Sequence, residues 1–181
     1  MKKKILVLTG SPRKNGNSDM LADAFIEGAS EMGHEVVKYD AGRKKINGCI
    51  ACQKCFSKGT ACVFKDDFNE LALLIEDADT LVITTPLYFY SFTAQIKAAI
   101  DKLYSFFIGK RPLKIKECLL IACGETDNLQ DFEGLIKSYQ ITADFLEWKN
   151  RGELIVTNVN EKGDVLNTDG QERAKKLGLS I

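Results

Sequence analysis

The sequence predicts an α/β fold in which a five-stranded parallel sheet carries helices on both faces. Five short apolar runs are typical of strands that are buried on both faces. Between these runs lie polar turns and segments whose apolar residues recur at helical spacing. Strands that alternate with helices in this way form parallel sheets with right-handed crossovers.

The first half of the chain begins with a strand at Ile5–Leu8. Apolar residues at helical spacing over 20–29 predict the first helix, and Gly33 indicates where it ends. A second, weaker strand is expected at 36–39. Residues 40–66 then show no periodicity, so we predict an insertion loop, and loops of this length in a compact domain are usually functional or disordered.

The second half of the chain begins at Asp67, which forms a capping-box pattern with Glu70 and predicts a helix through Ile75. We expect a single domain over residues 1–181. Ligands of such folds bind beyond the carboxyl ends of the strands, so the loops after the first, third and fourth strands are the candidate site. The remaining expected elements are strands at 81–85, 118–123 and 153–156 and helices at 92–107, 131–149 and 170–179.

The composition narrows the class of protein. Lys and Arg number 25, as do Asp and Glu, and this balance argues against a nucleic-acid partner. The apolar run after the N-terminal lysines is too short for a signal peptide, and no segment has the length of a membrane span. We therefore expect a cytoplasmic protein with no membrane partner, whose cysteines stay reduced.

The loop Gly10–Ser18 connects the first strand to the first helix. A helix N-terminus offers free N–H groups and the positive end of its dipole, which suit an anion. Hydroxyl and amide donors at Ser11, Asn17 and Ser18 and the charged fork of Arg13 favour a terminal phosphate. Neither common glycine-rich nucleotide pattern is present. The alternative is a polar turn in which Asn17 or Ser18 only caps the helix.

A family resemblance adds to this interpretation. Gly10–Arg13 followed by Gly16–Ser18 resembles the phosphate loop of the NAD(P)H-dependent FMN reductase family, within the flavodoxin-like superfamily. Thr85–Ser91, which leads into Gln95–Lys97 and Asp101, is similar to the second flavin loop of that family. The resemblance covers nearly the whole chain and implies a flavodoxin-like, doubly wound fold with FMN as cofactor.

The resemblance also implies which residues bind the flavin. It implies no catalytic side chain, because the hydride chemistry belongs to the cofactor. The alternative for residues 86–92 is an aromatic-rich turn that packs into the core. By resemblance, Ser11, Arg13, Asn17 and Ser18 hold the phosphate, Pro86, Leu87, Tyr88 and Phe89 line the isoalloxazine ring through backbone amides and side chains, and Gly124 contacts the flavin from the third loop.

Four of the six cysteines lie in the insertion loop, at Cys49, Cys52, Cys55 and Cys62. Thiols spaced by two residues can converge on an iron–sulfur cluster, whereas zinc more often takes two separated pairs. The segment also resembles the cysteine motif of iron–sulfur flavoproteins, a branch of the same family, which implies a [4Fe–4S] cluster that passes electrons to FMN. Free thiols at a subunit interface, a redox-active disulfide and zinc remain alternatives.

Two functions follow from these motifs. The first is an FMN-dependent oxidoreductase that passes electrons from NAD(P)H to a small acceptor such as a quinone or a flavin. The alternative is an iron–sulfur flavoprotein that takes electrons from a ferredoxin-type donor; a non-catalytic flavin sensor is a third class. The resemblance implies a homodimer or homotetramer, and the aromatic segments 87–92 and 104–107 suit partner contact or core packing equally.

Overall fold

The structure, a computed structural model, describes residues 1–181 and contains one parallel sheet with the strand order β2-β1-β3-β4-β5. The chain crosses from one side of β1 to the other between β2 and β3, so the switch point lies at the carboxyl ends of β1 and β3. The predicted flavodoxin-like α/β fold is confirmed. The strands are β1 Lys4–Thr9, β2 Glu35–Tyr39, β3 Thr80–Pro86, β4 Glu117–Cys123 and β5 Lys149–Val156.

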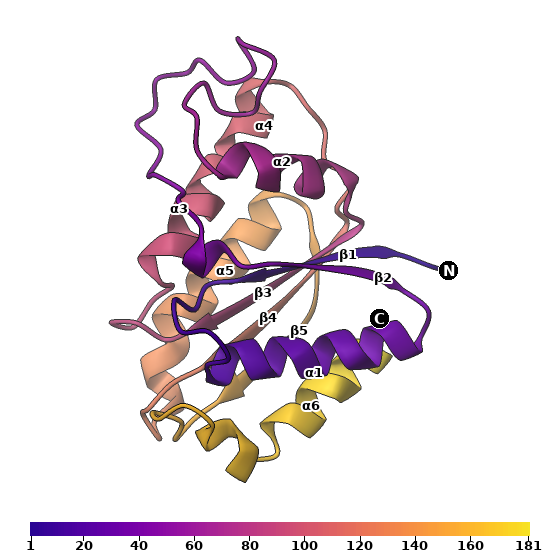
Figure 1. The fold of residues 1–181 in the computed structure, drawn as a ribbon, viewed down its shortest axis with the longest axis vertical. Helices are drawn as coiled ribbons and strands as arrows, with labels where there is room; N and C mark the ends of the chain where they lie inside the picture. The colour runs from indigo at the N-terminus through magenta and orange to yellow at the C-terminus, as the bar shows by residue number, and fades with distance from the viewer.

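Helices cover both faces of the sheet (Figure 1). Two of them pack together on one face: α1 Asn17–Glu31 and α6 Gly170–Leu179. None of the helices has both the length and the apolarity needed to cross a bilayer. The other elements are α2 Phe68–Asp77, α3 Ala94–Lys102, α4 Tyr104–Ile108 and α5 Glu133–Phe145, and the short 3-10 helices η1 Ala41–Arg43, η2 Leu129–Phe132 and η3 Asp164–Asn167.

The apolar core has two parts, one on each face of the sheet. Side chains alternate between the two faces along a strand, so Leu6 and Leu8 of β1 belong to one part, while Ile5 and Val7 belong to the other. Both parts are fully buried at β1, which explains why this strand is a continuous apolar run.

Two expected helices have different bounds in the structure. The helix expected at 92–107 is divided at Leu103 into α3 and α4. The helix expected at 131–149 ends at Phe145, because Glu147 adopts a left-handed φ of 55° and the following residues join the sheet as β5. The prediction for α1 is closer: Gly33, at φ 80°, follows the end of this helix as expected.

The capping box expected at Asp67 is wrong. The Asp67 side chain makes no capping hydrogen bond; its carboxylate accepts from the Lys45 amide at 2.7 Å. The Asp66 carboxylate instead accepts from the Phe68 amide at 3.1 Å and from the Asn47 amide at 3.0 Å. These two carboxylates therefore fasten the base of the insertion loop to the start of α2.

Candidate functional site

The carboxyl ends of the strands open onto one cavity of about 560 Å³, which we call the flavin cavity. Its volume lies within the range of about 300–1,000 Å³ that is typical of ligand pockets. The three loops that the sequence singled out converge here. All nine sequence-predicted flavin residues line this cavity: Ser11, Arg13, Asn17, Ser18, Pro86, Leu87, Tyr88, Phe89 and Gly124.

At one end of the flavin cavity, α1 presents unused donors. The first hydrogen bond within α1 runs from the Met20 amide to the Gly16 carbonyl, at 3.0 Å. The amides of Asn17, Ser18 and Asp19 donate no hydrogen bond within the chain. The Ser18 hydroxyl is also buried without a partner. Buried polar atoms are nearly always satisfied, so this end of the cavity suits an anion such as a phosphate.

Close packing fixes the loop that carries these donors. The Thr93 hydroxyl donates to the Gly10 carbonyl at 2.8 Å. A Cβ atom on Gly42 would lie 2.3 Å from the Ser11 carbonyl oxygen, so only glycine allows η1 to approach this closely. The Ser11 hydroxyl donates to the Arg13 carbonyl at 3.2 Å and bridges the turn. The loop is therefore held from several sides.

The buried carboxylate of Asp19 also holds this loop, from a position outside the flavin cavity. Asp19 accepts from the Asn15 amide at 2.9 Å and pairs with Lys38 at 2.6 Å. Burial opposes ionisation of Asp19, but the hydrogen bonds from Lys38 and the Asn15 amide hold its pKa below the usual range. Asp19 does not line the flavin cavity. Its negative charge is offset by two cations, Lys38 and Arg43, which lies 3.7 Å from the second carboxylate oxygen.

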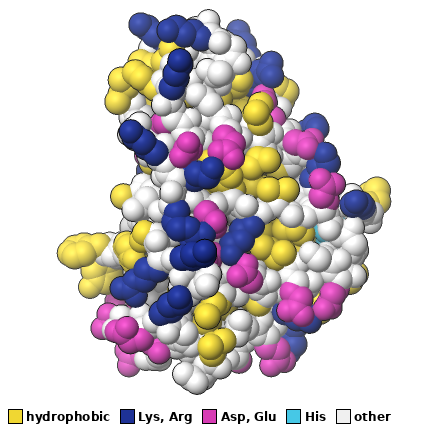
Figure 2. All heavy atoms as spheres, viewed as in Figure 1, with side chains coloured by type: hydrophobic (Ala, Val, Ile, Leu, Met, Phe, Trp, Pro, Cys, Tyr) yellow, Lys and Arg dark blue, Asp and Glu magenta, His cyan; other side chains and the backbone are white.

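The second loop forms a tight aromatic hairpin between β3 and α3. Tyr88 and Ser91 exchange backbone hydrogen bonds of 3.0 and 3.1 Å. Between them, Phe89 and Tyr90 adopt φ values of 47° and 65°, the left-handed turn geometry usually taken by Gly or Asn. Such backbone strain clusters at ligand sites. Phe89 is 97% exposed, and hydrophobic side chains project at the left edge of Figure 2, where this hairpin lies in Figure 1.

Of the backbone amides in this hairpin that were expected to donate to the flavin, only one is free to do so. The Leu87 amide donates to the Cys123 carbonyl at 2.7 Å, and the Tyr88 amide is used within the hairpin. Only the Phe89 amide remains unused among the amides predicted to face the flavin. Of the aromatic residues in 86–92, Phe92 alone is buried in the core.

The third loop contributes close packing. The Gly124 amide donates to the Val156 carbonyl at 3.0 Å, so it is not available to a ligand. A Cβ atom on Gly124 would lie 3.0 Å from the Phe132 ring and 3.1 Å from Leu87, so the glycine lets these side chains meet. Burial raises the pKa of the neighbouring Cys123 thiol to about 12, which keeps it protonated near neutral pH.

The loop after β5 was not among the loops predicted to form the site. Val159, Asn160 and Lys162 of this loop line the flavin cavity beside the phosphate loop. Residues 157–163 carry no motif, and our expectation covered only the loops after the first, third and fourth strands. The signal that could have found them is their position directly after the fifth strand, since all carboxyl ends of a parallel sheet share one edge.

The insertion loop that carries the four cysteines lies in a different part of the molecule, at the top of Figure 1. Cys49, Cys52, Cys55 and Cys62 all border one small cavity of about 30 Å³. Burial, followed by the nearby Cys52 and Cys49 thiols, raises the pKa of Cys55. No three His, Cys, Asp or Glu side chains are arranged here as metal ligands. An all-thiol donor set nevertheless suits iron–sulfur chemistry.

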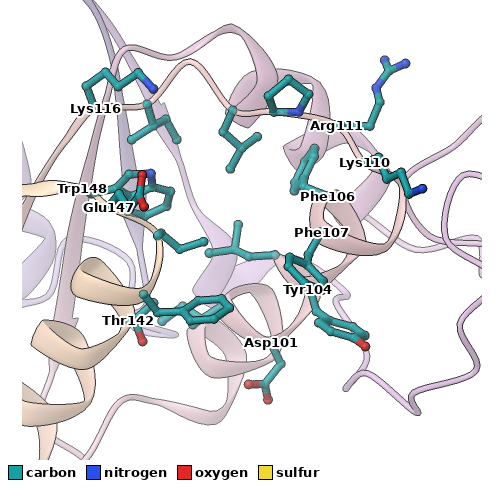
Figure 3. Close-up of a pocket in the computed structure, with 17 residues that line it drawn as sticks. Asp101, Tyr104, Phe106, Phe107, Lys110, Arg111, Lys116, Thr142, Glu147 and Trp148 are labelled. Atoms are coloured by element: carbon teal, nitrogen blue, oxygen red, sulfur yellow. The ribbon is translucent and has the colours of Figure 1, made fainter.

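A third hollow of about 590 Å³ lies between α4, the loop after it and the end of α5. Figure 3 shows Phe106 and Trp148 on opposite sides of this hollow, while Lys110 and Arg111 point away from it. The exposed rings of Tyr104 and Phe107 form part of its rim, the two ring centroids lying 6.0 Å apart. None of the predicted flavin residues reaches it, so it is separate from the flavin cavity.

Comparisons with known proteins agree with the fold. An iron–sulfur flavoprotein of Methanocaldococcus jannaschii is 31% identical over 188 residues, which cover 98% of this chain and 95% of that protein. An iron–sulfur flavoprotein of Archaeoglobus fulgidus is 39% identical over 109 residues, and the chain spans only 48% of its length. The structure of an NAD(P)H:quinone oxidoreductase from Methanothermobacter marburgensis shares the fold, with a TM-score of 0.78, 20% identity and coverage of 99% and 96% of the two chains.

A comparison with protein families also relates the sequence to flavin-binding proteins. Residues 3–131 match the NADPH-dependent FMN reductase family. The matched region contains the phosphate loop, the cysteine loop, the aromatic hairpin and Gly124, and it ends before α5. The chain therefore belongs to the NADPH-dependent FMN reductase family, a family of flavin-dependent NAD(P)H oxidoreductases.

Proposed function

We propose that this chain binds FMN in the flavin cavity and passes electrons from NAD(P)H to a small acceptor such as a quinone or a flavin. The observation that carries the proposal is the convergence of the three predicted flavin loops on one cavity whose α1 end holds a buried, unpartnered Ser18 hydroxyl. The residues fit the cofactor in kind: donors suit the phosphate at one end, and an aromatic hairpin suits a flat ring at the other.

The chain's own groups would bind and orient the cofactor. The amides at the start of α1, the Ser18 hydroxyl and the Arg13 guanidinium would hold the phosphate. The unused Phe89 amide would donate to the edge of the ring. Bound FMN supplies the hydride and electron chemistry. NAD(P)H and then the acceptor would approach the ring past the exposed Phe89, at the edge of the cavity.

Steady-state turnover tests this function. Purified protein loaded with FMN should oxidise NADH or NADPH when a quinone or free flavin is supplied, and protein without FMN should not. Comparing the two nicotinamides and several acceptors would also name the preferred pair. Loaded protein that oxidises neither nicotinamide with any acceptor would contradict the proposal.

A second candidate is an iron–sulfur flavoprotein in which Cys49, Cys52, Cys55 and Cys62 hold a [4Fe–4S] cluster. Two observations favour it: the four thiols border one cavity, and similar proteins carry that name. The charge of the loop favours an acidic protein donor of the ferredoxin type, because residues 41–65 contain no Asp or Glu. The cations of this segment are Arg43, Lys44, Lys45, Lys54, Lys58 and Lys65.

Anaerobic reconstitution distinguishes the second candidate from the first. Protein treated with iron and sulfide, then desalted, should hold about four irons per chain if the cluster forms. Reduction of the cluster by an acidic ferredoxin should slow as salt is raised, because salt screens the attraction to the lysines. Protein that retains no iron would leave the NAD(P)H reaction as the only proposed route.

Assembly and location also remain proposals. We propose a homodimer or homotetramer in the cytoplasm, whose contact includes the exposed Tyr104 and Phe107 at the rim of the third hollow. We further propose that residues 1–181 act as one FMN-binding domain, since the flavin cavity is lined by residues from Ser11 to Lys162. Light scattering of the purified chain would give the assembly directly.

A further inference from the structure

The loop at 157–163, which we call the β5–η3 loop, lies directly against the phosphate loop. The Arg13 guanidinium donates to the Asn160 carbonyl at 3.3 Å. The Asn17 side-chain amide donates to the Glu161 carbonyl at 2.8 Å. The two loops are almost 150 residues apart in sequence, yet these contacts make them one structure at the edge of the flavin cavity. The family match ends at residue 131 and so does not include the β5–η3 loop.

Asn17 uses both ends of its side chain to hold the β5–η3 loop. Besides the bond donated to Glu161, its side-chain oxygen accepts from the Gly163 amide at 3.0 Å and the Val165 amide at 3.3 Å. The Asn17 side chain is therefore occupied, and only its backbone amide is free to face a phosphate. Its side chain acts as a positioning group between two loops.

The turn at the tip of the β5–η3 loop has a fixed shape. The Asp164 carboxylate accepts from the Asn160 amide at 2.9 Å and from the Glu161 amide at 2.7 Å. Gly163 adopts a φ of 98°, which side chains rarely allow. Lys162 lies between these anchors, so its backbone is held in place, and this exposed lysine is one of the residues that line the flavin cavity.

The charges around the flavin cavity suggest that Lys162 supplies positive charge to a bound phosphate. The charged side chains that line it are Arg13, Lys162 and Glu125, and Lys162 makes no ion pair within the chain. Arg13 is already engaged with the Asn160 carbonyl. A phosphate monoester carries a charge between about −1.5 and −2 near neutral pH. The positive end of α1 supplies only about half a charge, so a second cation would complete the balance.

We infer that Lys162 is a phosphate-binding residue of the flavin site and that Asn17 positions it. This inference rests on the proposed FMN site and extends it with a segment outside the family match. In this arrangement the phosphate is bound from two sides, by the α1 terminus with Ser18 and by the β5–η3 loop. The site would select a phosphorylated flavin over riboflavin, which offers no anion to Lys162.

The test compares the dissociation constants of FMN and riboflavin. Lys162→Gln should weaken FMN binding about tenfold, or about 1.4 kcal/mol, while riboflavin binding stays unchanged. Lys162→Arg keeps the charge and should restore most of the FMN affinity. Lys137→Gln is the matched control, because it makes the same charge change on α5 away from the cavity. An unchanged FMN-to-riboflavin ratio in Lys162→Gln would overturn the inference.

Two further measurements separate related outcomes. If Asn17 acts through Lys162, the FMN losses of Asn17→Ala and Lys162→Gln should not add in the double variant; additive losses would overturn the positioning role. A Lys162→Gln effect confined to the KM for NADPH, with NADH and FMN unchanged, would assign the lysine to the cosubstrate and overturn the inference. If the wild-type chain binds no FMN, the proposed function itself fails, which is a different result.

Discussion

The phosphate loop and the cysteine loop differ in how completely the polypeptide fixes them. The phosphate loop is held by Thr93, Gly42 and Asp19, and its unused donors already face one cavity. In the cysteine loop, no backbone amide between Gly48 and Cys55 donates a hydrogen bond within the chain. Three residues there, Ala51, Gln53 and Phe56, adopt left-handed φ values above 50°.

This difference in hydrogen bonding indicates what orders each loop: the polypeptide itself or a bound metal. The proposed flavin site is built by the sheet and by the loops that its strands carry, so we expect it to be formed before the ligand binds. The cysteine loop is anchored at its base through Asp66 and Asp67, and farther along it by the Cys62 amide and the Phe56 ring, but not between residues 48 and 55. Loops with few internal hydrogen bonds open easily, and metal binding can supply the missing folding energy. We therefore expect metal to order the cysteine loop.

The largest expected effect comes from removing one thiol. Cys52→Ser should abolish the cluster after anaerobic reconstitution, lowering the iron content from about four per chain to near zero. FMN affinity should stay within about twofold, because Cys52 does not line the flavin cavity. Cys118→Ala, at a buried cysteine outside the loop, is the control and should retain its iron. Full iron content in Cys52→Ser would show that these thiols do not form the ligand set.

The buried ion pair beneath the cysteine loop comes next. Lys102 at the end of α3 pairs with Asp66, and both side chains are almost fully buried. Lys102→Met should cost about 3–5 kcal/mol in the free energy of unfolding, because it leaves a buried carboxylate without its cation. Lys44→Met breaks an exposed pair with Glu70 and should cost less than about 1 kcal/mol. Equal losses in urea unfolding would contradict this assignment.

The same pair makes stability depend on acid. Burial opposes ionisation of Asp66, but hydrogen bonds from Lys102 and the Asn47 amide hold its pKa below the usual range. A carboxyl whose pKa is lowered by folding stabilises the protein above its unfolded pKa of about 3.9, and this stability is lost as pH falls further. Melting temperatures should therefore drop below about pH 4. In Asp66→Asn the melting temperature should fall less steeply below about pH 4. If it falls as steeply as in the wild type, Asp66 does not cause the loss of stability in acid.

Substituting a glycine in each region compares how tightly the phosphate loop and the cysteine loop are packed. Gly42→Ala should cost about 1–3 kcal/mol, because the added Cβ meets the Ser11 carbonyl at 2.3 Å and one of the two segments must shift. Gly48→Ala, in the cysteine loop, meets nothing within 4 Å and should change stability by less than about 0.5 kcal/mol. FMN affinity should fall only in Gly42→Ala. Similar unfolding curves for both variants would argue against a tightly held phosphate loop.

The smallest expected effect is that of Ser18→Ala, which should weaken FMN binding without destabilising the protein. Ser18→Ala should leave the FMN-free protein as stable as before or slightly more stable, because it removes a buried hydroxyl that has no partner. The same change should weaken FMN binding by about two- to tenfold, the value of one hydrogen bond. Ser30→Ala near the exposed end of α1 is the control. A destabilised Ser18→Ala with normal FMN affinity would mean that the hydroxyl serves the fold.

Sequence reasoning found most of the fold because buried parallel strands are continuous apolar runs. It also placed nine residues at one cavity, since carboxyl-end loops must share an edge. It missed the left-handed turn at Glu147, because a glutamate gives no sign of this backbone state. It assigned the Asn17 side chain to the phosphate, whereas hydrogen bonds to residues 161–165 engage it. Contacts between distant loops leave no local pattern, which is why Lys162 was missed.

Hydrogen exchange of the wild-type chain, with and without FMN, tests the central claim most directly. A preformed site with the phosphate at the start of α1 predicts slower exchange at the free amides of Asn17, Ser18 and Asp19 when FMN is added. Exchange between residues 48 and 55 should stay fast with FMN and slow only after iron and sulfide are supplied. Unchanged exchange at all three α1 amides with saturating FMN would contradict the account.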